Sequence, residues 1–583
     1  MKTILCCAFL TLALAGRAAA PIEVFMDTLA AEWMRADPEG ATATQYFQGS
    51  EQDALDRQLT PITQEYRRGR VEAAERGLRT LKSFGTNDLT SAQRISAASL
   101  TWQLEDVAKQ ERFRDYVFIF QQFHGLQAGL VNFLSQTHPM RNRRDVENYL
   151  VRLEQVARVL DDGIAQARER GDRGFIPPKF ILTATIDQVD RFLKPGPRQN
   201  VLVASLEERS DRIKELSAQD RAVFVATAEK TVSASIRPAF ERIKALLSAQ
   251  LPRATDEAGL GRFPEGAAAY RDALRRFTTS DLDAAQIHAL GRKEIARIES
   301  KMDTLLRQLG YGSGTVQERM TKLEGDAQPQ EADPRPRLLA EYTRIVRDAE
   351  KRCELLFDLR PRAPVEVKRE PEFTEKNAAA HYTPPARDGS RPGTFWVPLP
   401  GPSYRMNGMR TLAYHEAVPG HHFQVALQQE LTEMPRFRRD RVFGFLSAHG
   451  EGWALYAEQL AAESGWYEGD IRGQLGQLND ELFRARRLVV DTGLHSLHWT
   501  RQQAIDFGIP VSEVERYVVW PGQACAYKIG QLKILEVRDR AKAALGSNFS
   551  LKEFHNVVLR TGSVPLPVLE TAIEDYVAGK RKK

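Results

Sequence analysis

Helical periodicity constrains the fold of this chain more than any other feature. Apolar residues recur every three or four positions, with polar residues between them, in the stretches 91–112, 145–170 and 284–310. This spacing places the apolar side chains on one face of an α-helix, which then packs against a neighbouring element. The sequence shows no internal repeat of the length typical of solenoids. We therefore expect a mainly α fold built from long helices.

A short region of different composition interrupts the helical pattern. Residues 363–373 ("APVEVKREPEF") and 393–400 ("GTFWVPLP") contain β-branched and aromatic residues bounded by proline and glycine, as strands do. The segment between them, "HYTPPARDGSRPG", has the composition of a loop, and the helical pattern returns after Tyr404. We expect a small β-sheet here, and an exposed strand edge can pair with an extended peptide.

Composition excludes one class of partner. The chain has 82 basic and 77 acidic residues, largely interspersed, whereas a nucleic-acid site concentrates basic residues with aromatic ones. We therefore expect no nucleic-acid partner, and the sequence does not indicate an oligomeric state. Beyond the first residues the chain has two cysteines, Cys353 and Cys525. They form either a disulfide, which an exported protein allows, or two buried thiols.

The N-terminus is typical of an exported protein. A basic Lys2, an apolar run from Ile4 to Ala15 and small residues after it match a secretory signal peptide. Cleavage after Ala15 and cleavage after Ala20 both satisfy the small-residue rule. No other stretch is apolar for the ~20 residues that a membrane span needs. We expect a signal peptide in residues 1–20, a periplasmic or secreted location and no stable membrane span.

Residues 415–422, "HEAVPGHH", resemble an interrupted zinc-peptidase helix. In the usual H-E-x-x-H helix two histidines hold zinc and the glutamate beside the first acts as general base. A catalytic zinc ion takes three protein ligands, usually histidines or carboxylates, and keeps one position open. His415 and Glu416 supply the opening pair. The remaining ligands must come from later residues.

The second ligand requires a break in the helix. On a straight helix, neither His421 nor His422 would reach a metal ion held by His415. Pro419-Gly420 interrupts the helix between them, and such a break can swing one of the two histidines back. The spacing leaves both histidines open as ligands.

The third ligand is expected in the next long helix, within residues 448–466 ("AHGEGWALYAEQLAAESGW"). Many zinc peptidases take a glutamate from such a helix, which favours Glu451. His449 is the rival ligand in the same segment. Glu458 lies two turns beyond Glu451 and is expected to form a salt bridge or to orient a neighbour.

Four motifs in order give the chain a family resemblance: "HEAVPGHHFQ", "EGWALYAE", "RLVVDTGLH" and "RYVVWPGQACAYKIG". With them the chain resembles the bacterial proteins grouped as domain of unknown function 885. The resemblance covers nearly the whole mature chain and is strongest between residues 391 and 530. That family is regarded as related to helical zinc peptidases such as thimet oligopeptidase and carboxypeptidase Taq. The resemblance implies a mainly α, long-helix metallopeptidase-like fold, with a deep cleft and a small β-sheet next to the zinc helix.

The resemblance also implies roles for individual residues. The family pattern H-E-x-x-P-G-H-x-x-Q selects His421 over His422, and the family E-G-W selects Glu451. The implied zinc ligands are therefore His415, His421 and Glu451, with Glu416 as the base.

Later motifs imply the remaining site residues. In related peptidases a tyrosine or histidine from a later helix stabilises the oxyanion, and Tyr527 and His495 are the candidates here, with Asp491 orienting His495. Arg516 and Tyr517 are candidates for binding a substrate carboxylate. The substrate-binding edge is expected at Arg391-Pro392-Gly393.

These inferences lead to one expected function and two alternatives. We expect residues 21–350 to form an N-terminal helical region and residues 351–583 to form the catalytic region, with one cleft between them. The expected protein is an exported, gluzincin-like zinc metallopeptidase that hydrolyses amide bonds of short peptides with a Glu-activated zinc-bound water. The alternatives are a zinc hydrolase of a non-peptide amide or ester, and a non-catalytic helical protein that binds peptides.

Overall fold

The computed structural model describes residues 22–582, except 86–87, 372–374, 376–377, 388 and 390. The expected signal peptide, residues 1–20, lies outside the described residues. In the described part of the chain the structure is mainly helical with a three-stranded sheet. The predicted helices at 91–112, 145–170 and 284–310 are confirmed as α5, α7 and α13. No described helix is both long enough and apolar enough to span a membrane.

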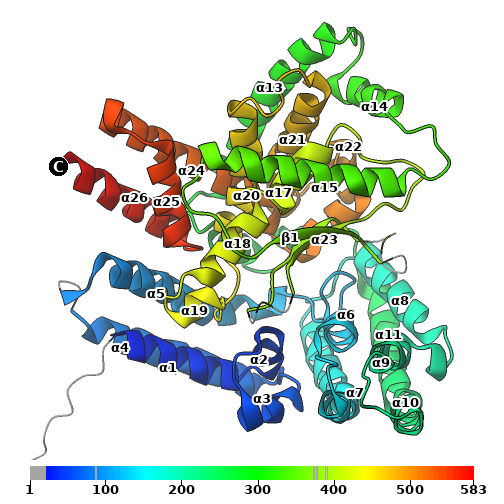
Figure 1. The fold of residues 1–583 in the computed structure, drawn as a ribbon. Coiled ribbons are helices and arrows are strands. Elements are labelled where there is room, and N and C mark those ends of the chain that lie inside the picture. The colour runs from blue at the N-terminus through cyan, green and yellow to red at the C-terminus, as the bar shows by residue number, and fades with distance from the viewer. Residues whose placement is uncertain are drawn as a thin grey trace, which may run out of the picture.

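The first eleven helices form the lower part of the molecule in Figure 1. Two hydrophobic cores hold them, one shared by α1, α4 and α5, and the other by α6 to α11. Their bounds are α1 Ile22–Arg35, α2 Pro38–Thr44, α3 Gly49–Asp56, α4 Gln64–Ser83, α5 Ser91–Gln110, α6 Leu126–Asn132, α7 Arg143–Asp172, α8 Lys179–Leu193, α9 Val201–Ser210, α10 Ala218–Thr231 and α11 Arg237–Gln250.

Most of the later helices form the upper part of the molecule in Figure 1, whereas α19 lies lower and contacts α1. Helices α13 and α12 pack on α21 and α24 respectively, so helices from before residue 350 belong to the core that supports the site. The bounds are α12 Gly266–Thr278, α13 Ala284–Gln308, α14 Val316–Asp326, α15 Arg335–Arg352, α17 Met409–Glu416, α18 His421–Glu430, α19 Arg436–Arg439, α20 Ser447–Glu463, α21 Ile471–Ser496, α22 Arg501–Asp506, α23 Val511–Val519, α24 Gln523–Leu545, α25 Leu551–Thr561 and α26 Leu566–Arg581.

The predicted sheet is present, with one strand more than the sequence indicated. Strands β1 (Val365–Arg369) and β3 (Gly393–Val397) lie where they were expected and pair in parallel. The segment expected to be a loop contributes β2 (His381–Thr383), which pairs antiparallel with β3. The strand order is β1-β3-β2, so β3 is central and β2 lies at the edge. Three residues followed by two prolines carry too little strand signal for sequence reasoning to detect.

Two glycines bring α20 and α24 into close contact. A Cβ atom on Gly452 would lie 2.5 Å from backbone atoms of Gly530, and one on Gly530 would lie 1.8 Å from the carbonyl oxygen of Ala448. Only glycine allows two helix backbones to approach this closely. The contact fixes the spacing between Glu451 on α20 and Tyr527 on α24.

The two cysteines outside the N-terminal segment are both free and buried. Cys353 packs in the core around β3 and α17, and Cys525 packs in the core around α21 and α24. Of the two sequence alternatives, the structure shows buried thiols rather than a disulfide.

Candidate metal centre

The helix that carries His415 is broken in the way the sequence suggested. Helix α17 ends at Glu416 and α18 begins at His421, and the backbone of Ala417 (ψ −93°) and Gly420 (ψ −127°) is not helical. The break turns His421 toward His415, and the centroids of the two imidazole rings are 4.8 Å apart. The Pro-Gly break between the two histidines therefore brings their imidazole rings close together.

Two contacts hold the broken segment in place. A Cβ atom on Gly420 would lie 1.9 Å from the carbonyl oxygen of His415, so only glycine fits at this position. The indole N–H of Trp453 donates a hydrogen bond of 2.9 Å to the carbonyl oxygen of Pro419. Trp453 follows Glu451 on α20, so the "EGW" motif supplies both a candidate ligand and the support for the break.

Three candidate ligands converge in the structure. His415, His421 and Glu451 each offer one ligand atom, and these atoms all lie within 4.8 Å of one another. A carboxylate oxygen of Glu451 is 3.7 Å from Nε2 of His415 and 3.4 Å from Nε2 of His421. Two imidazoles and one carboxylate form the ligand set of many catalytic zinc sites, which leave a fourth position open.

A further carboxylate orients the first histidine. Nδ1 of His415 lies 2.7 Å from a carboxylate oxygen of the buried Glu458. This bond fixes the ring so that Nε2 points toward Glu451 and His421. Metal-binding histidines commonly hold a carboxylate on the second nitrogen in this way. The sequence expectation that Glu458 orients a neighbour is met by this contact.

The electrostatics of the cluster favour a cation. Burial of the His415 imidazole lowers its pKa, but hydrogen bonds to Glu451 and Glu458 outweigh burial and raise the pKa to about 9. Burial raises the pKa of Glu451, but the charge of His421 and the contact with His415 bring it well below its usual range. A site that stabilises positive charge this strongly also suits a divalent metal ion. The residues present therefore fit a zinc ion.

Glu416 lies beside the cluster and is free to act as a base. Its side chain is buried and lines the same pocket as the three candidate ligands. Burial raises the pKa of Glu416, while the charges of His415 and His421 oppose the shift. A carboxylate with a raised pKa accepts a proton more readily near neutral pH than an ordinary glutamate does.

The neighbouring histidines serve the structure instead. His422 lies between the hydroxyl of Tyr382, 3.0 Å from Nδ1, and the carbonyl oxygen of Ala363, 3.1 Å from Nε2. Burial lowers the pKa of His422 to about 4, so the ring stays neutral. His449, the rival third ligand, is buried and accepts a hydrogen bond from the backbone N–H of Val564. Neither belongs to the convergent group.

A pocket of about 840 Å³ opens over the candidate metal centre, and we call it the metal pocket. Helices α17, α18, α20, α21, α23 and α24 contribute to its walls, and β2 borders one side. Of the sequence candidates, Tyr527 and Arg516 both line this pocket. The guanidinium carbon of Arg487 lies 4.5 Å from the centre of the Tyr527 ring. The structure therefore brings the tyrosine candidate to the pocket wall.

The histidine candidate for the oxyanion lies elsewhere. His495 is buried, and it is not among the residues that line the pocket. Its Nδ1 accepts from the backbone N–H of Leu260 and its Nε2 donates to the carbonyl oxygen of Tyr517. Asp491 does not orient it, since that carboxylate accepts from the hydroxyl of Tyr270 and the N–H of Gly522. Both ring nitrogens are used by the backbone, so the expectation for His495 needs correction.

Three expectations for substrate binding change as well. The hydroxyl of Tyr517 is buried between Glu513 and Arg487, where it holds Arg487 rather than a ligand. Gly393 starts the central strand, and a Cβ atom there would lie 2.6 Å from the His422 ring. The prediction of a substrate-binding edge at Arg391-Pro392-Gly393 is therefore wrong. Strand β3 begins at Gly393 and pairs with another strand on each side, so it has no free edge for a peptide. Arg391 lines a neighbouring cavity.

Sequence reasoning missed several residues of the pocket wall. Four arginines line it in addition to Arg516: Arg405, Arg441, Arg484 and Arg487. Arg487 is the first residue of the family motif "RLVVDTGLH", and this motif is the sequence signal that could have identified it. The free edge of β2 was also missed, because the strand itself was not predicted.

Comparison with known proteins places the chain in a family. A family model described as "Bacterial protein of unknown function (DUF885)" matches residues 38–573. The chain belongs to this family. The resemblance inferred from the four motifs is therefore confirmed as family membership.

Solved structures of similar proteins share the fold. The crystal structure of a protein from Colwellia psychrerythraea, described as a "putative lipoprotein", has 31% sequence identity and a TM-score of 0.88. The match covers 95% of this chain and 99% of that chain. A protein from Shewanella oneidensis with the same description matches at 18% identity and a TM-score of 0.70, over the same shares of both chains, which shows the fold alone. No curated protein matches this chain.

Proposed function

We propose that this protein is an exported zinc-dependent metallopeptidase that hydrolyses amide bonds of short peptides. The observation that carries the proposal is the convergence of His415, His421 and Glu451 in a pocket that also contains the unliganded Glu416. A structural metal site, which only links two helices, does not need a buried, proton-accepting carboxylate beside its ligands. The arrangement therefore supports hydrolysis more than a structural role.

The chemistry divides among the residues of the pocket. A zinc ion, when bound by the two histidines and Glu451, supplies Lewis acidity that polarises a carbonyl group and lowers the pKa of water. Glu416 takes the proton from the attacking water and passes it to the leaving nitrogen. The hydroxyl of Tyr527 donates to the oxygen on which negative charge develops. Glu458 keeps the His415 ring oriented throughout.

The small sheet supports a peptide substrate over another amide or an ester. Strand β2 pairs with β3 on one side, and among the described residues no strand pairs with its other side. Residues 379–382 of this strand and its approach line the pocket of the candidate metal centre. An extended peptide can add to such an edge through main-chain hydrogen bonds, which a small ester cannot do. The pocket volume of about 840 Å³ suits short peptides rather than folded proteins.

An exported location is part of the proposal. The N-terminal segment has the composition of a signal peptide. The Colwellia psychrerythraea protein of similar structure is described as a lipoprotein. Both observations support a protein that works outside the cytoplasm, where short peptides are available as nutrients or as products of other peptidases.

The decisive experiment replaces the base and keeps the ligands. Glu416→Gln should retain one zinc ion per chain by metal analysis, because the ligands are unchanged. Cleavage of a mixed peptide library, followed by mass spectrometry, should fall by about 10³-fold. The wild-type protein with chelator should lose the same activity and regain it with added zinc. Unchanged cleavage by the variant, or a wild-type protein without stoichiometric metal, would contradict the proposal.

A further inference from the structure

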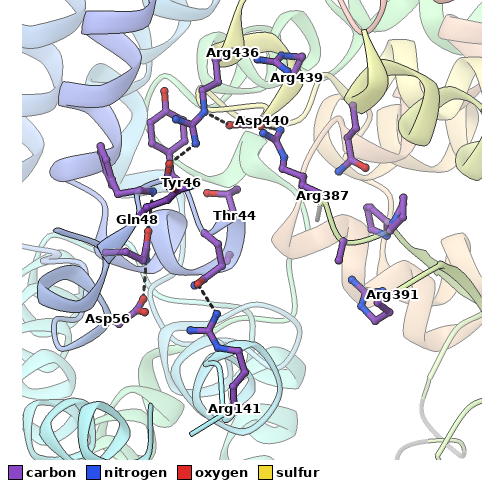
Figure 2. A pocket seen from close by; sticks show the side chains of 18 of the residues that line it. Thr44, Tyr46, Gln48, Asp56, Arg141, Arg387, Arg391, Arg436, Arg439 and Asp440 are labelled. Carbon is purple, nitrogen blue, oxygen red and sulfur yellow. Dashed lines mark hydrogen bonds and ion pairs between the residues drawn. The ribbon is translucent and has the colours of Figure 1, made fainter. Parts of the chain in front are cut away.

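A second cavity, of about 1300 Å³, lies beside the metal pocket. Its walls come from the segment around α2 and α3, the start of α7, the segment that follows β2, and helices α18 and α19. Figure 2 shows its side chains around a common space, with Arg436 and Arg439 on one side and Arg141 on the opposite side. We call this cavity the arginine chamber.

The arginine chamber is continuous with the metal pocket. Three residues line both cavities: Pro384, Val425 and Arg441. Pro384 directly follows the edge strand β2, and the segment 383–387 continues into the arginine chamber. A peptide that pairs with β2 beside the metal centre would therefore run onward into the arginine chamber.

The arginine chamber has more cationic than anionic side chains. Seven arginines line it, at positions 141, 144, 387, 391, 436, 439 and 441, against four aspartates, at positions 53, 56, 145 and 440. The aspartates are already engaged. Asp53 pairs with Arg144, Asp145 with Arg141, and Asp440 with both Arg387 and Arg436. Asp56 accepts hydrogen bonds from Thr42 and Gln52.

Three arginines remain without an acidic partner among the described residues: Arg391, Arg439 and Arg441. Nε of Arg439 and Nη2 of Arg441 are buried and have no hydrogen-bond partner in the described part of the chain. A buried N–H group without a partner costs free energy that a ligand can recover. Burial and the charges of Arg439 and Arg436 also lower the pKa of Arg387 to about 10, which reflects the crowding of cations in the arginine chamber.

We propose that the arginine chamber binds carboxylate side chains of the peptide substrate, away from the bond that is cleaved. This inference rests on the proposed peptidase function. Guanidinium groups match carboxylates in geometry and charge. An unpaired guanidinium group in a partly closed cavity gains the most free energy from binding a carboxylate, because it has no other partner to give up. From His381, beside Glu416, to Thr383 the strand advances by roughly 7 Å. The bound carboxylates therefore belong to residues about two to four positions from the cleaved bond.

Hydrolysis of matched peptides tests the inference. The substrates are one cleaved peptide, acetylated and amidated at its ends, and its versions with a single Glu or Gln at each position. The wild-type protein should prefer Glu over Gln by about tenfold in kcat/KM at one or two positions, two to four residues from the cleaved bond. The double variant Arg391→Gln/Arg439→Gln should lose this preference and keep its activity on the Gln peptides. Arg158→Gln, an exposed arginine of α7 outside both cavities, serves as the matched control.

A binding measurement separates this inference from the proposed function. Fluorescence anisotropy with labelled Glu and Gln peptides on the full-length Glu416→Gln variant needs no turnover. If no peptide is cleaved by any form, yet Glu peptides bind about tenfold tighter and lose this advantage in the arginine double variant, the proposed function fails and the arginine chamber stands. If peptides are cleaved with dependence on Glu416 but Glu and Gln peptides behave alike, the inference about the arginine chamber is overturned. Displacement of the Glu peptide by inorganic phosphate at equal concentration would overturn the assignment to peptide carboxylates.

Discussion

The metal pocket and the arginine chamber adjoin each other, yet they differ in whether their charged side chains have partners of opposite charge. In the metal pocket, charged groups around the candidate ligands are held by partners: His415 by Glu458, and Arg487 by Glu513. The unpaired Arg441 lies where the two cavities meet. In the arginine chamber Arg391 and Arg439 have no acidic partner among the described residues. Paired charges hold reacting groups in one orientation, whereas unpaired charges are available to a ligand. This difference is what we expect if, as proposed, the metal pocket carries out the chemistry and the arginine chamber binds part of the substrate.

The largest effect should come from closing the break between α17 and α18. In Gly420→Ala the added Cβ would lie 1.9 Å from the carbonyl oxygen of His415, so the backbone must shift. We expect a loss of stability of about 3 kcal/mol and loss of stoichiometric zinc, measured by thermal unfolding and metal analysis. Gly69→Ala in α4 is the control, because a Cβ there meets nothing within 4 Å and should be neutral or stabilising. Full zinc content in Gly420→Ala would show that the break does not position the ligands.

The next largest effect should distinguish Tyr527 from His495, the two residues that the sequence suggested for stabilising the oxyanion. Tyr527→Phe removes a hydroxyl from the wall of the metal pocket, and kcat should fall about 100-fold with little change in KM. His495→Gln removes a ring that packs on Tyr270 and whose two nitrogens bond to the backbone, so the variant should lose stability but keep the kcat of the folded protein. Steady-state kinetics corrected for the folded fraction measures both. A larger loss of kcat in His495→Gln than in Tyr527→Phe would return the oxyanion role to the histidine.

A smaller effect should follow from removing the charge behind His415. Glu458→Gln keeps the size of the side chain but weakens its hold on Nδ1 of the imidazole. Metal affinity should fall by about 10- to 100-fold, measured by competition with a chelator. Glu463→Gln on the same helix is the control, since Glu463 pairs with Arg538 at the surface. Equal zinc affinity in both variants would mean that the Glu458 contact is not needed to orient the ligand.

The smallest expected effect is that of salt concentration, which should act differently on the two cavities. Exposed charges are screened with a Debye length of about 10 Å at 0.1 M salt and about 3 Å at 1 M. Raising the salt over this range should reduce the preference for acidic peptides several-fold through KM, because the unpaired arginines of the chamber are responsible. The kcat for neutral peptides should stay nearly constant, because His415 and Arg487 in the metal pocket are buried and paired with carboxylates. A fall in kcat as large as the rise in KM would remove the distinction between the two cavities.

Sequence reasoning predicted those parts of the molecule in which local pattern determines structure. The long helices followed from periodicity, and the family membership followed from four ordered motifs. The break at Pro419-Gly420 was predictable because proline and glycine disrupt helices locally, whatever the rest of the fold does. The choice of His421 over His422 needed the family pattern, and the structure agrees through the separate bonds that His422 makes.

Features that depend on tertiary contacts were not predictable. His495 lies in a motif and resembles a catalytic residue, yet its partners Leu260 and Tyr517 come from distant parts of the chain. Strand β2 has only three residues, and its pairing with β3 creates the edge that sequence reasoning had assigned to residues 391–393. The excess of arginines in the arginine chamber arises from three segments that no local pattern joins: the start of α7, the segment after β2, and the region of α19.

The close packing of Gly452 against Gly530 limits how this protein can move. Helices α20 and α24 meet through their backbones, so they have little freedom to slide or separate without disrupting the core. In the proposed peptidase, substrate entry and product release would therefore depend on parts of the pocket wall outside these two helices, such as β2. The helices that carry Glu451 and Tyr527 would keep their spacing throughout a catalytic cycle.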